Sequence, residues 1–198
     1  MEITPTEVHE SFSEEITPSS GKLLVAKMTE HTHHDVERVV LDLSSPGGRV
    51  ESAMILYKEF LSSPFELVTH NVGEVASMGT IVFLAGDRRL ASPEATFLLH
   101  PIIFTDTAVP MNVYDWRRVR TRLERSSNHS RTAEVDRRIS QLDKEEADVR
   151  KVLEQRTRLT EPAIRELVRE SEPIGAAEAL AFGIVHEIIP ASRSQLDS

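Results

Sequence analysis

The chain has 198 residues, of which 39% are hydrophobic and 28% are charged, and its net charge is −9. This length allows one domain with a substantial core. The absence of cysteine excludes disulfides, thiolate zinc sites and cysteine nucleophiles. The acidic balance argues against a nucleic-acid partner, because excess carboxylates repel a phosphate backbone.

The first twenty residues are polar and acidic, and they lack the basic start and apolar run of a signal peptide. We expect residues 1–20 to form a loosely structured lead-in. No run of the sequence reaches the roughly 18 apolar residues that a membrane span needs. These features predict a cytoplasmic protein without a membrane partner.

Residues 21–101 alternate between helical and strand patterns. Helical spacing of apolar residues occurs in 21–35, 49–63 and 77–86, and strand patterns occur in 36–48, in 65–73 and, after a turn at Ser92-Pro93, up to His100. The order strand–helix–strand–helix–strand, with short connections, predicts an α/β fold of parallel crossover units. Apolar residues on both faces of the strands fit a sheet buried between helices.

After Pro110 the chain becomes highly charged and nearly free of glycine. A coiled-coil-like spacing, which we call the seam, joins Val135, Ile139, Leu142, Val149 and Leu153, with Glu146 at the skipped position. Such a narrow apolar stripe must meet another helix of this chain or of a neighbouring subunit. Further predictions are a helix break at 126–128, helices in 161–170 and 175–183, and a last strand in 184–190.

Ser77 stands in an otherwise apolar run, where a strand pattern passes into a helical one. A hydroxyl at a helix N-terminus lies among free N–H groups and the positive end of the helix dipole, which suits a nucleophile. Its neighbours Ala76 and Gly79 are small, so a substrate could approach closely. Serine is also a favoured helix N-cap, and the segment by itself favours that simpler role.

His100 ends the third predicted strand, so it can reach the same end of a parallel sheet as Ser77. A neutral imidazole is the usual base for a serine hydroxyl, although by itself His100 is more simply interpreted as a partly buried structural histidine.

The sequence SSPGG, which ends in Gly47-Gly48, can aim backbone N–H groups into a cleft as an oxyanion hole does. The same sequence is also a common turn.

Together these segments resemble the proteolytic subunit of the Clp protease (ClpP), a self-compartmentalised serine peptidase. The matching segments, which follow the family's order, are LDLSSPGGRVESAMILYKEF, GEVASMGTIVFLAG, FLLHP and GAAEALAFGIV. The resemblance covers about residues 16–189. It implies the ClpP/crotonase-like fold, a superhelix of repeated βαβ units with a largely parallel sheet flanked by helices, and it implies neither a cofactor nor a metal.

By this resemblance Ser77 is the nucleophile and His100 is the general base. The N–H groups of Gly48 and Met78 form the oxyanion hole, with Gly47 adjoining. The implied reaction is the hydrolysis of peptide bonds by acyl transfer, with peptides or unfolded protein as substrates.

The third member of the implied triad departs from the family's pattern. The family's triad aspartate precedes the C-terminal helix, and an ungapped alignment places Ser171 there. A shift of one residue lets Glu172 orient His100, and a glutamate can serve in that role. A catalytic dyad without a third member is the other interpretation.

Two further departures concern assembly. In the family, the region after the catalytic histidine is a helical handle that interleaves two rings, and residues 111–160 form a longer version of it within a single domain, 1–198. The resemblance and the seam therefore predict a homo-oligomer, as one ring or as two stacked rings. The family's axial loop, which docks an ATP-driven unfoldase, has no counterpart in residues 1–20, so such a partner is not expected.

Two other functions stay open. A crotonase-type acyl-CoA enzyme shares the architecture and the glycine-lined oxyanion hole but needs no serine nucleophile. A catalytically weak or silent scaffold on the peptidase fold would account for Ser171 at the acid position.

The remaining motif, HTHH with His31, His33 and His34, is interpreted as a solvated turn and not as a metal site.

Overall fold

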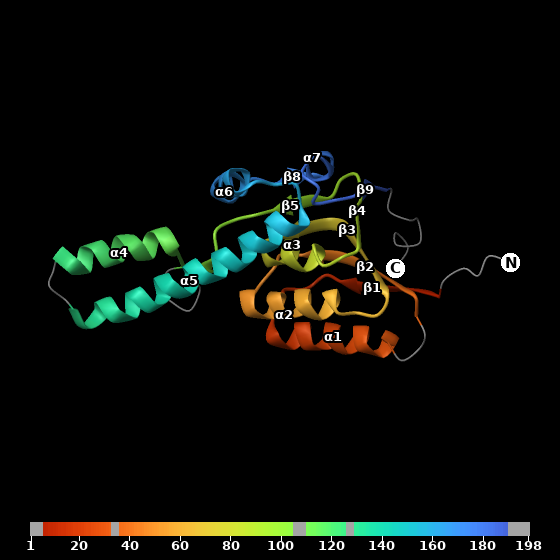
Figure 1. The fold of residues 1–198 in the computed structure, drawn as a ribbon, viewed down its shortest axis with the longest axis horizontal. Coiled ribbons are helices and arrows are strands. Elements are labelled where there is room, and N and C mark those ends of the chain that lie inside the picture. The colour runs from red at the N-terminus through yellow and green to blue at the C-terminus, as the bar shows by residue number, and fades with distance from the viewer. Residues whose placement is uncertain (1–5, 33–35, 105–109, 126–128, 190–198) are drawn as a thin grey trace.

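The computed structural model describes residues 6–32, 36–104, 110–125 and 129–189. It is an α/β fold with a largely parallel sheet flanked by helices, which confirms the predicted fold class (Figure 1). The strands are β1 (Glu7–Phe12), β2 (Arg38–Ser45), β3 (Glu66–Ala76), β4 (Arg88–Ala91), β5 (Thr96–Leu98), β6 (Ile103–Phe104), β7 (Met111–Asn112), β8 (Ile174–Gly175) and β9 (Glu187–Ile188). The helices are α1 (Pro18–Thr32), α2 (Val50–Leu61), α3 (Met78–Phe83), α4 (Val113–Arg125), α5 (His129–Arg156), α6 (Glu161–Glu170) and α7 (Ala176–Ala181).

The central strand is β3, which is long enough to pair with two neighbours in succession. Strands β1, β2, β3, β4 and β9 lie side by side in this order, and all are parallel. The second half of β3 pairs with β5, where Ala76 lies opposite Leu98, and β8 runs antiparallel to β5. Because β3 and β5 are parallel, Ser77 and His100, which follow them, lie at the same edge of the sheet.

The main hydrophobic core joins the sheet to helices α1, α2 and α3 and also to α5, α6 and α7. On β2 the alternate residues Val39, Leu41 and Leu43 are fully buried in this core, as the two-residue period of a strand requires. Figure 1 shows α1 and α2 together on one side of the strands, with α6 and α7 on the other. The sheet is thus a rigid support for the loops at its edge.

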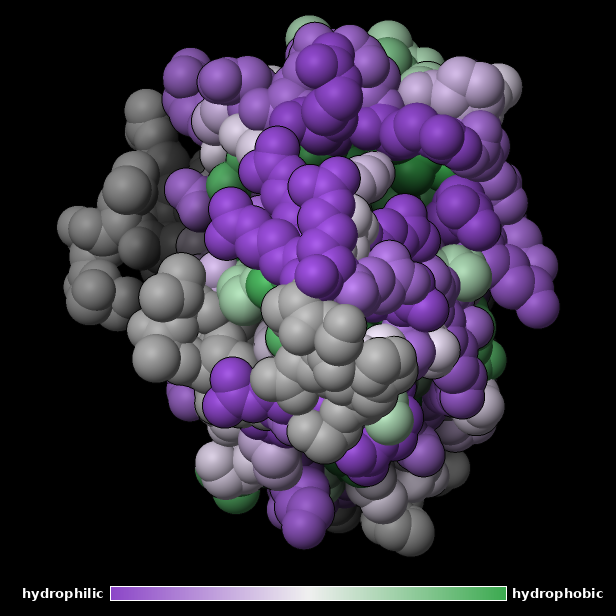
Figure 2. All heavy atoms as spheres, turned by 90° about the vertical axis from the view of Figure 1, so that its left-hand side faces the viewer, coloured by the Kyte–Doolittle hydropathy of each residue, from purple (hydrophilic) through white to green (hydrophobic). Residues whose placement is uncertain are grey.

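Helices α4 and α5 form a hairpin, which we call the handle, that projects from the body (Figure 1). In the seam, Val135 and Leu142 pack with Val113 and Trp116 of α4, whereas Leu153 joins the main core. The seam therefore finds its partners within this chain. Viewed from the handle end, the surface is mostly hydrophilic, since the apolar side chains face inward (Figure 2).

The prediction of a loose lead-in is wrong for its described part, because residues 7–12 form β1 in register with β2. The strand pattern is hidden by Glu10, which takes an inward-facing position and lies 2.9 Å from His31 Nε2 of α1. Beyond β1, Ile16 is fully buried and bridges the backbone at Gly48. Main-chain pairing with β2 and the contacts of Glu10 with Lys27 and His31 of α1 thus order a segment that composition suggested was loose.

Two further findings complete the comparison with the predicted elements. Residues 88–91 form a separate strand, β4, and the strand predicted to end at His100 ends at Leu98. The predicted helix break at 126–128 lies outside the described residues. In the part of the chain that the structure describes, no helix is both long enough and apolar enough to cross a membrane.

Candidate active site

Ser77 occupies the sharp turn between β3 and α3. Its backbone has φ 53° and ψ −126°, a region that non-glycine residues rarely adopt and that costs about 1–3 kcal/mol. Ser77 takes the N-cap position of α3, yet its hydroxyl makes no cap hydrogen bond. The helix-cap interpretation therefore loses its physical basis, because a cap stabilises a helix through that bond. A strained strand-to-helix turn is how α/β hydrolases present a serine nucleophile.

The loop after β2 lies directly against this turn. A Cβ atom placed on Gly47 would stand 2.7 Å from both Ala76 O and Ser77 Cβ, and 2.9 Å from Met78 N. Gly47 has φ 90° and Gly48 has φ 148°, so glycine is required at both positions. The close approach places the SSPGG loop directly against the serine turn.

Two backbone N–H groups at this junction are available to a ligand. Among the described residues, neither Gly48 N–H nor Met78 N–H makes a hydrogen bond, because the bridge to Ile16 uses the carbonyl of Gly47 and the N–H of Arg49. The N–H of Gly47 is engaged, since Ser45 Oγ accepts it at 3.2 Å. Gly47 therefore shapes the turn, and the pair of free donors is that of Gly48 and Met78.

His100 follows β5 and is half-buried. Its Nδ1 lies 2.8 Å from the carbonyl oxygen of Pro101. A carbonyl only accepts hydrogen bonds, so Nδ1 carries the proton and Nε2 keeps a free lone pair. This is the tautomer that a general base needs. No hydrogen bond joins His100 to Ser77 in this structure, although both residues are described.

Ser77 and His100 border two separate cavities. Ser77 and Gly48 line a cavity of about 700 Å³ between the body and α5, and His100 lines a second one of about 740 Å³ between its own loop, α4, α5 and α6. Ile102 borders both, so residues 100–102 form the wall between them. Ser77 and His100 thus face different cavities in this structure.

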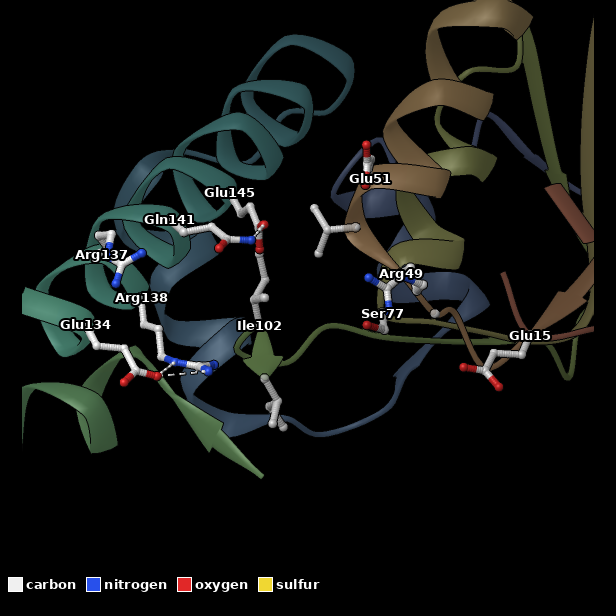
Figure 3. Close-up of a pocket in the computed structure, with 13 residues that line it drawn as sticks. Glu15, Arg49, Glu51, Ser77, Ile102, Glu134, Arg137, Arg138, Gln141 and Glu145 are labelled. Atoms are coloured by element: carbon white, nitrogen blue, oxygen red, sulfur yellow. Dashed lines mark hydrogen bonds and ion pairs between the residues drawn. The ribbon is translucent and has the colours of Figure 1, made fainter. Parts of the chain in front are cut away.

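The lining of the first cavity is strongly charged (Figure 3). Ser77 and Arg49 face Gln141 and Glu145 of α5 across it. On α5, Glu134 accepts from Arg138 Nε at 3.4 Å, and the Arg138 guanidinium also lies 5.0 Å from the centre of the Trp116 ring. The handle thus contributes one wall of the cavity that Ser77 borders.

The structure shows no hydrogen bond from His100 to Glu172, the acid predicted from the sequence, or to Ser171, which occupies the ungapped acid position. Ser171 ends α6 in a left-handed conformation, and its hydroxyl donates to the carbonyl of Val168 at 2.9 Å. Glu172 is exposed and makes no hydrogen bond or ion pair with any described residue. In this structure the group that orients the imidazole is the Pro101 carbonyl.

A second cluster of polar side chains lies inside the sheet, and sequence reasoning missed it. We call it the buried cluster: Asp42 Oδ1 lies 2.9 Å from His70 Nδ1, and Ser92 Oγ lies 3.3 Å from His70 Nε2. The register places Asp42 opposite His70 on neighbouring strands. The sequence offers no local signal for it, because the first two residues are 28 positions apart.

The histidine-rich turn is only partly described. His31 lies 2.9 Å from a Glu10 oxygen, whereas His33 and His34 lie outside the described residues. Among the side chains that the structure describes, no group of three or more histidines and carboxylates could hold a metal ion.

The parallel crossover sheet, the strained serine turn and the glycine loop together define an α/β protein with a site typical of serine hydrolases. A sequence model of the family described as Clp protease matches residues 6–115, which is more than half of the chain. The chain therefore belongs to the Clp protease family.

Individual relatives match over shorter segments. Subunit 1 of the ATP-dependent Clp protease of Leifsonia xyli subsp. xyli is 32% identical over 89 residues, which are 43% of this chain and 45% of that protein. The corresponding subunit 1 of Mycobacterium leprae is 36% identical over 64 residues, 31% of this chain and 32% of that protein. The matched segments thus span less than half of these relatives.

A solved structure extends the likeness of the fold to nearly the whole chain. A single-site variant of ClpP1 from Listeria monocytogenes superposes with a TM-score of 0.75 and covers 93% of this chain and 92% of that chain. The sequence identity is 15%, so this likeness concerns the fold alone.

Proposed function

We propose that this chain is a serine peptidase that hydrolyses peptide bonds by acyl transfer, with Ser77 as nucleophile and His100 as general base. The observation that carries the proposal is the backbone of Ser77, which is held at φ 53° with its hydroxyl free of a cap bond. Strain of this kind persists where the surrounding structure enforces it, and it concentrates at active sites. The family membership supports the same activity.

The proposed reaction follows from the groups around Ser77. The hydroxyl oxygen attacks the peptide carbonyl while Nε2 of His100 takes the hydroxyl proton. The N–H groups of Gly48 and Met78 stabilise the negative oxygen that forms, and the imidazolium gives its proton to the leaving amine. Water then hydrolyses the acyl-enzyme by the same steps. For this proton transfer the imidazole of His100 must turn toward Ser77, past Ile102, which borders both cavities.

Peptides and unfolded protein segments are the proposed substrates, because the cavity beside Ser77 is open and lined by charged side chains. A homo-oligomeric ring, single or stacked, is part of the proposal, as is a cytoplasmic setting. The relatives named above are subunits of ATP-dependent proteases, whereas our proposal includes no unfoldase for this chain. The crotonase alternative is not favoured, because the family match is to Clp proteases.

The proposal is tested by peptide hydrolysis together with labelling by a fluorophosphonate. We expect the probe to modify Ser77, as located by mass spectrometry of the digested protein. The Ser77→Ala variant should lose labelling and hydrolysis by about 10³-fold or more, with an unchanged native mass. Hydrolysis that persists in this variant would reject Ser77, and a wild-type chain that neither hydrolyses nor labels would favour the silent scaffold.

A further inference from the structure

Helix α3, which follows Ser77, is held at both of its ends. At its start, the N–H of Ser77 donates to the carbonyl of Leu98 in β5 at 2.6 Å. At its end, Thr69 Oγ1 of β3 donates to the carbonyl of Phe83 at 2.8 Å. All six residues of the helix are buried. Because α3 is short and enclosed, a constraint at its end can act on the backbone of Ser77.

Helix α5 of the handle supplies a further constraint at the end of α3. Arg156, the last residue of α5, donates from Nε to the carbonyl of Leu84 at 2.9 Å and from Nη2 to the carbonyl of Gly86 at 2.8 Å. The carbonyls at a helix end lack partners inside the helix, and the guanidinium fork can bond two of them at once. In Figure 1 the last turns of α5 lie beside α3. One side chain of the handle thus fixes the chain where α3 ends.

A second arginine holds the main chain of Arg156. Arg89 of β4 is 4% exposed, and its Nη2 donates to the carbonyl of Arg156 at 2.8 Å. It also donates to the carbonyls of Gly183 at 3.0 Å and Ile184 at 2.8 Å. Burial lowers the pKa of Arg89 to about 10, and nearby Arg156 adds to this, so the side chain is still charged at neutral pH. The two arginines therefore join the sheet, the end of α5 and the end of α3 through main-chain carbonyls.

The strained backbone of Ser77 needs support on both sides. A residue at φ 53° relaxes unless the surrounding structure holds it there. The pairing with β5 holds the side that faces β3, and the bonds from Arg156 hold the far end of α3. We propose that Arg156 is a positioning residue for the nucleophile, which keeps Ser77 in its strained conformation by fixing the end of α3. The handle then acts on Ser77 through its last residue as well as through the cavity wall.

The inference rests on the proposed function, so its first test does not depend on activity. Ser77→Gly removes the strain and Ser77→Ala retains it, so the difference between their thermal unfolding midpoints measures the strain. With Arg156 present, the glycine variant should unfold about 2–4 °C higher. In the Arg156→Gln background this difference should disappear, because the end of α3 can then move and the backbone at position 77 relaxes. Arg156→Lys keeps the charge without the fork and should give an intermediate difference.

Arg158→Gln is the matched control. Arg158 lies close by in the chain, but its Nη2 donates to the carbonyl of Leu180 in α7 at 2.6 Å and not to α3. The substitution also removes an arginine and a bond to a helix carbonyl. It should leave the difference between Ser77→Gly and Ser77→Ala unchanged.

A second measurement tests the effect on chemistry. The rate of fluorophosphonate labelling of Ser77 is measured at a temperature at which every variant is folded. Arg156→Gln should slow labelling by about tenfold, because a small displacement of a reacting group lowers the rate steeply. Arg156→Lys should recover part of the rate, and Arg158→Gln should be labelled at the wild-type rate.

The outcomes separate the two proposals. An unchanged glycine–alanine difference in the Arg156→Gln background overturns the assignment of Arg156, whatever the overall stability of that variant. Equal effects of Arg156→Gln and Arg158→Gln also overturn it, as does the absence of any difference when Arg156 is present. If the wild-type chain is not labelled at Ser77, the proposed function fails, while the unfolding midpoints still decide whether Arg156 holds the backbone of Ser77.

Discussion

The chain contains two arrangements of serine with histidine, one inside the sheet and one at its edge. In the buried cluster, hydrogen bonds join Ser92, His70 and Asp42 in the order of a complete Ser–His–Asp triad. At the edge, no hydrogen bond joins Ser77 to His100, and among the described residues no carboxylate accepts a hydrogen bond from the imidazole. Hydrogen bonding alone would select Ser92 and not Ser77, the proposed nucleophile.

The accessibility of each serine to a substrate and its backbone geometry favour Ser77 instead. Asp42, His70 and Ser92 are 6%, 6% and 7% exposed, so a substrate cannot reach them. Ser77 instead borders an open cavity, has a strained backbone and lies beside two free N–H donors. The proposed nucleophile Ser77 therefore differs from the buried Ser92 in its access to solvent and in the free N–H groups beside it.

The two regions are nevertheless connected through the strands. Asp42 lies on β2, which leads into the SSPGG loop, and His70 lies on β3, which leads into Ser77. The buried cluster thus holds together the two strands that carry the candidate site. It is expected to affect stability, whereas the edge is expected to affect chemistry.

The largest expected effect on stability comes from Asp42→Ala. This change removes the buried partner of His70 Nδ1 and leaves His70 only its contact with Ser92, so the free energy of unfolding should fall by about 3–5 kcal/mol. Urea unfolding measures it. Ser92→Ala is the milder control and should lose about 1 kcal/mol, since its contact is 3.3 Å long. Ser77 should still be labelled in either folded variant; labelling that moves to Ser92 would contradict the distinction.

A smaller effect is expected from Gly47→Ala, which tests the contact between the loop and the serine turn. A Cβ there would stand 2.7 Å from Ala76 O and from Ser77 Cβ, with φ at 90°. We therefore expect the free energy of unfolding to fall by about 2 kcal/mol and the labelling of Ser77 to slow. Gly175→Ala is the matched control, because a Cβ there meets nothing within 4 Å. Equal effects of the two substitutions would show that the loop does not press on the site.

The smallest expected effect is the difference in stability between two variants of Ser77, which measures the backbone strain at that position. Ser77→Gly relaxes the backbone at positive φ, whereas Ser77→Ala keeps the strain, and neither variant has a hydroxyl. The glycine variant should be more stable by about 1 kcal/mol, because relief of strain exceeds the entropy that glycine loses on folding. Thermal unfolding of the two variants decides it, and an alanine variant of equal or greater stability would place the strain elsewhere.

Much of this architecture is local and was predictable. The alternation of strands and helices, the glycine turn at Gly47-Gly48 and the positions of Ser77 and His100 after parallel strands follow from short-range patterns, because periodicity and turn chemistry act over a few residues. Strand β1 was missed because Glu10 interrupts its pattern, and its order comes from pairing with β2.

The sequence by itself thus determined the fold class and the positions of Ser77 and His100, each directly after a strand pattern. Tertiary structure decided which groups meet: that the seam packs on α4 and the body, that Asp42 meets His70, and that Arg156 reaches the end of α3 while Glu172 stays exposed. The physical reason is that these contacts join residues tens of positions apart. Such pairings depend on how the whole chain packs, and no local pattern encodes them.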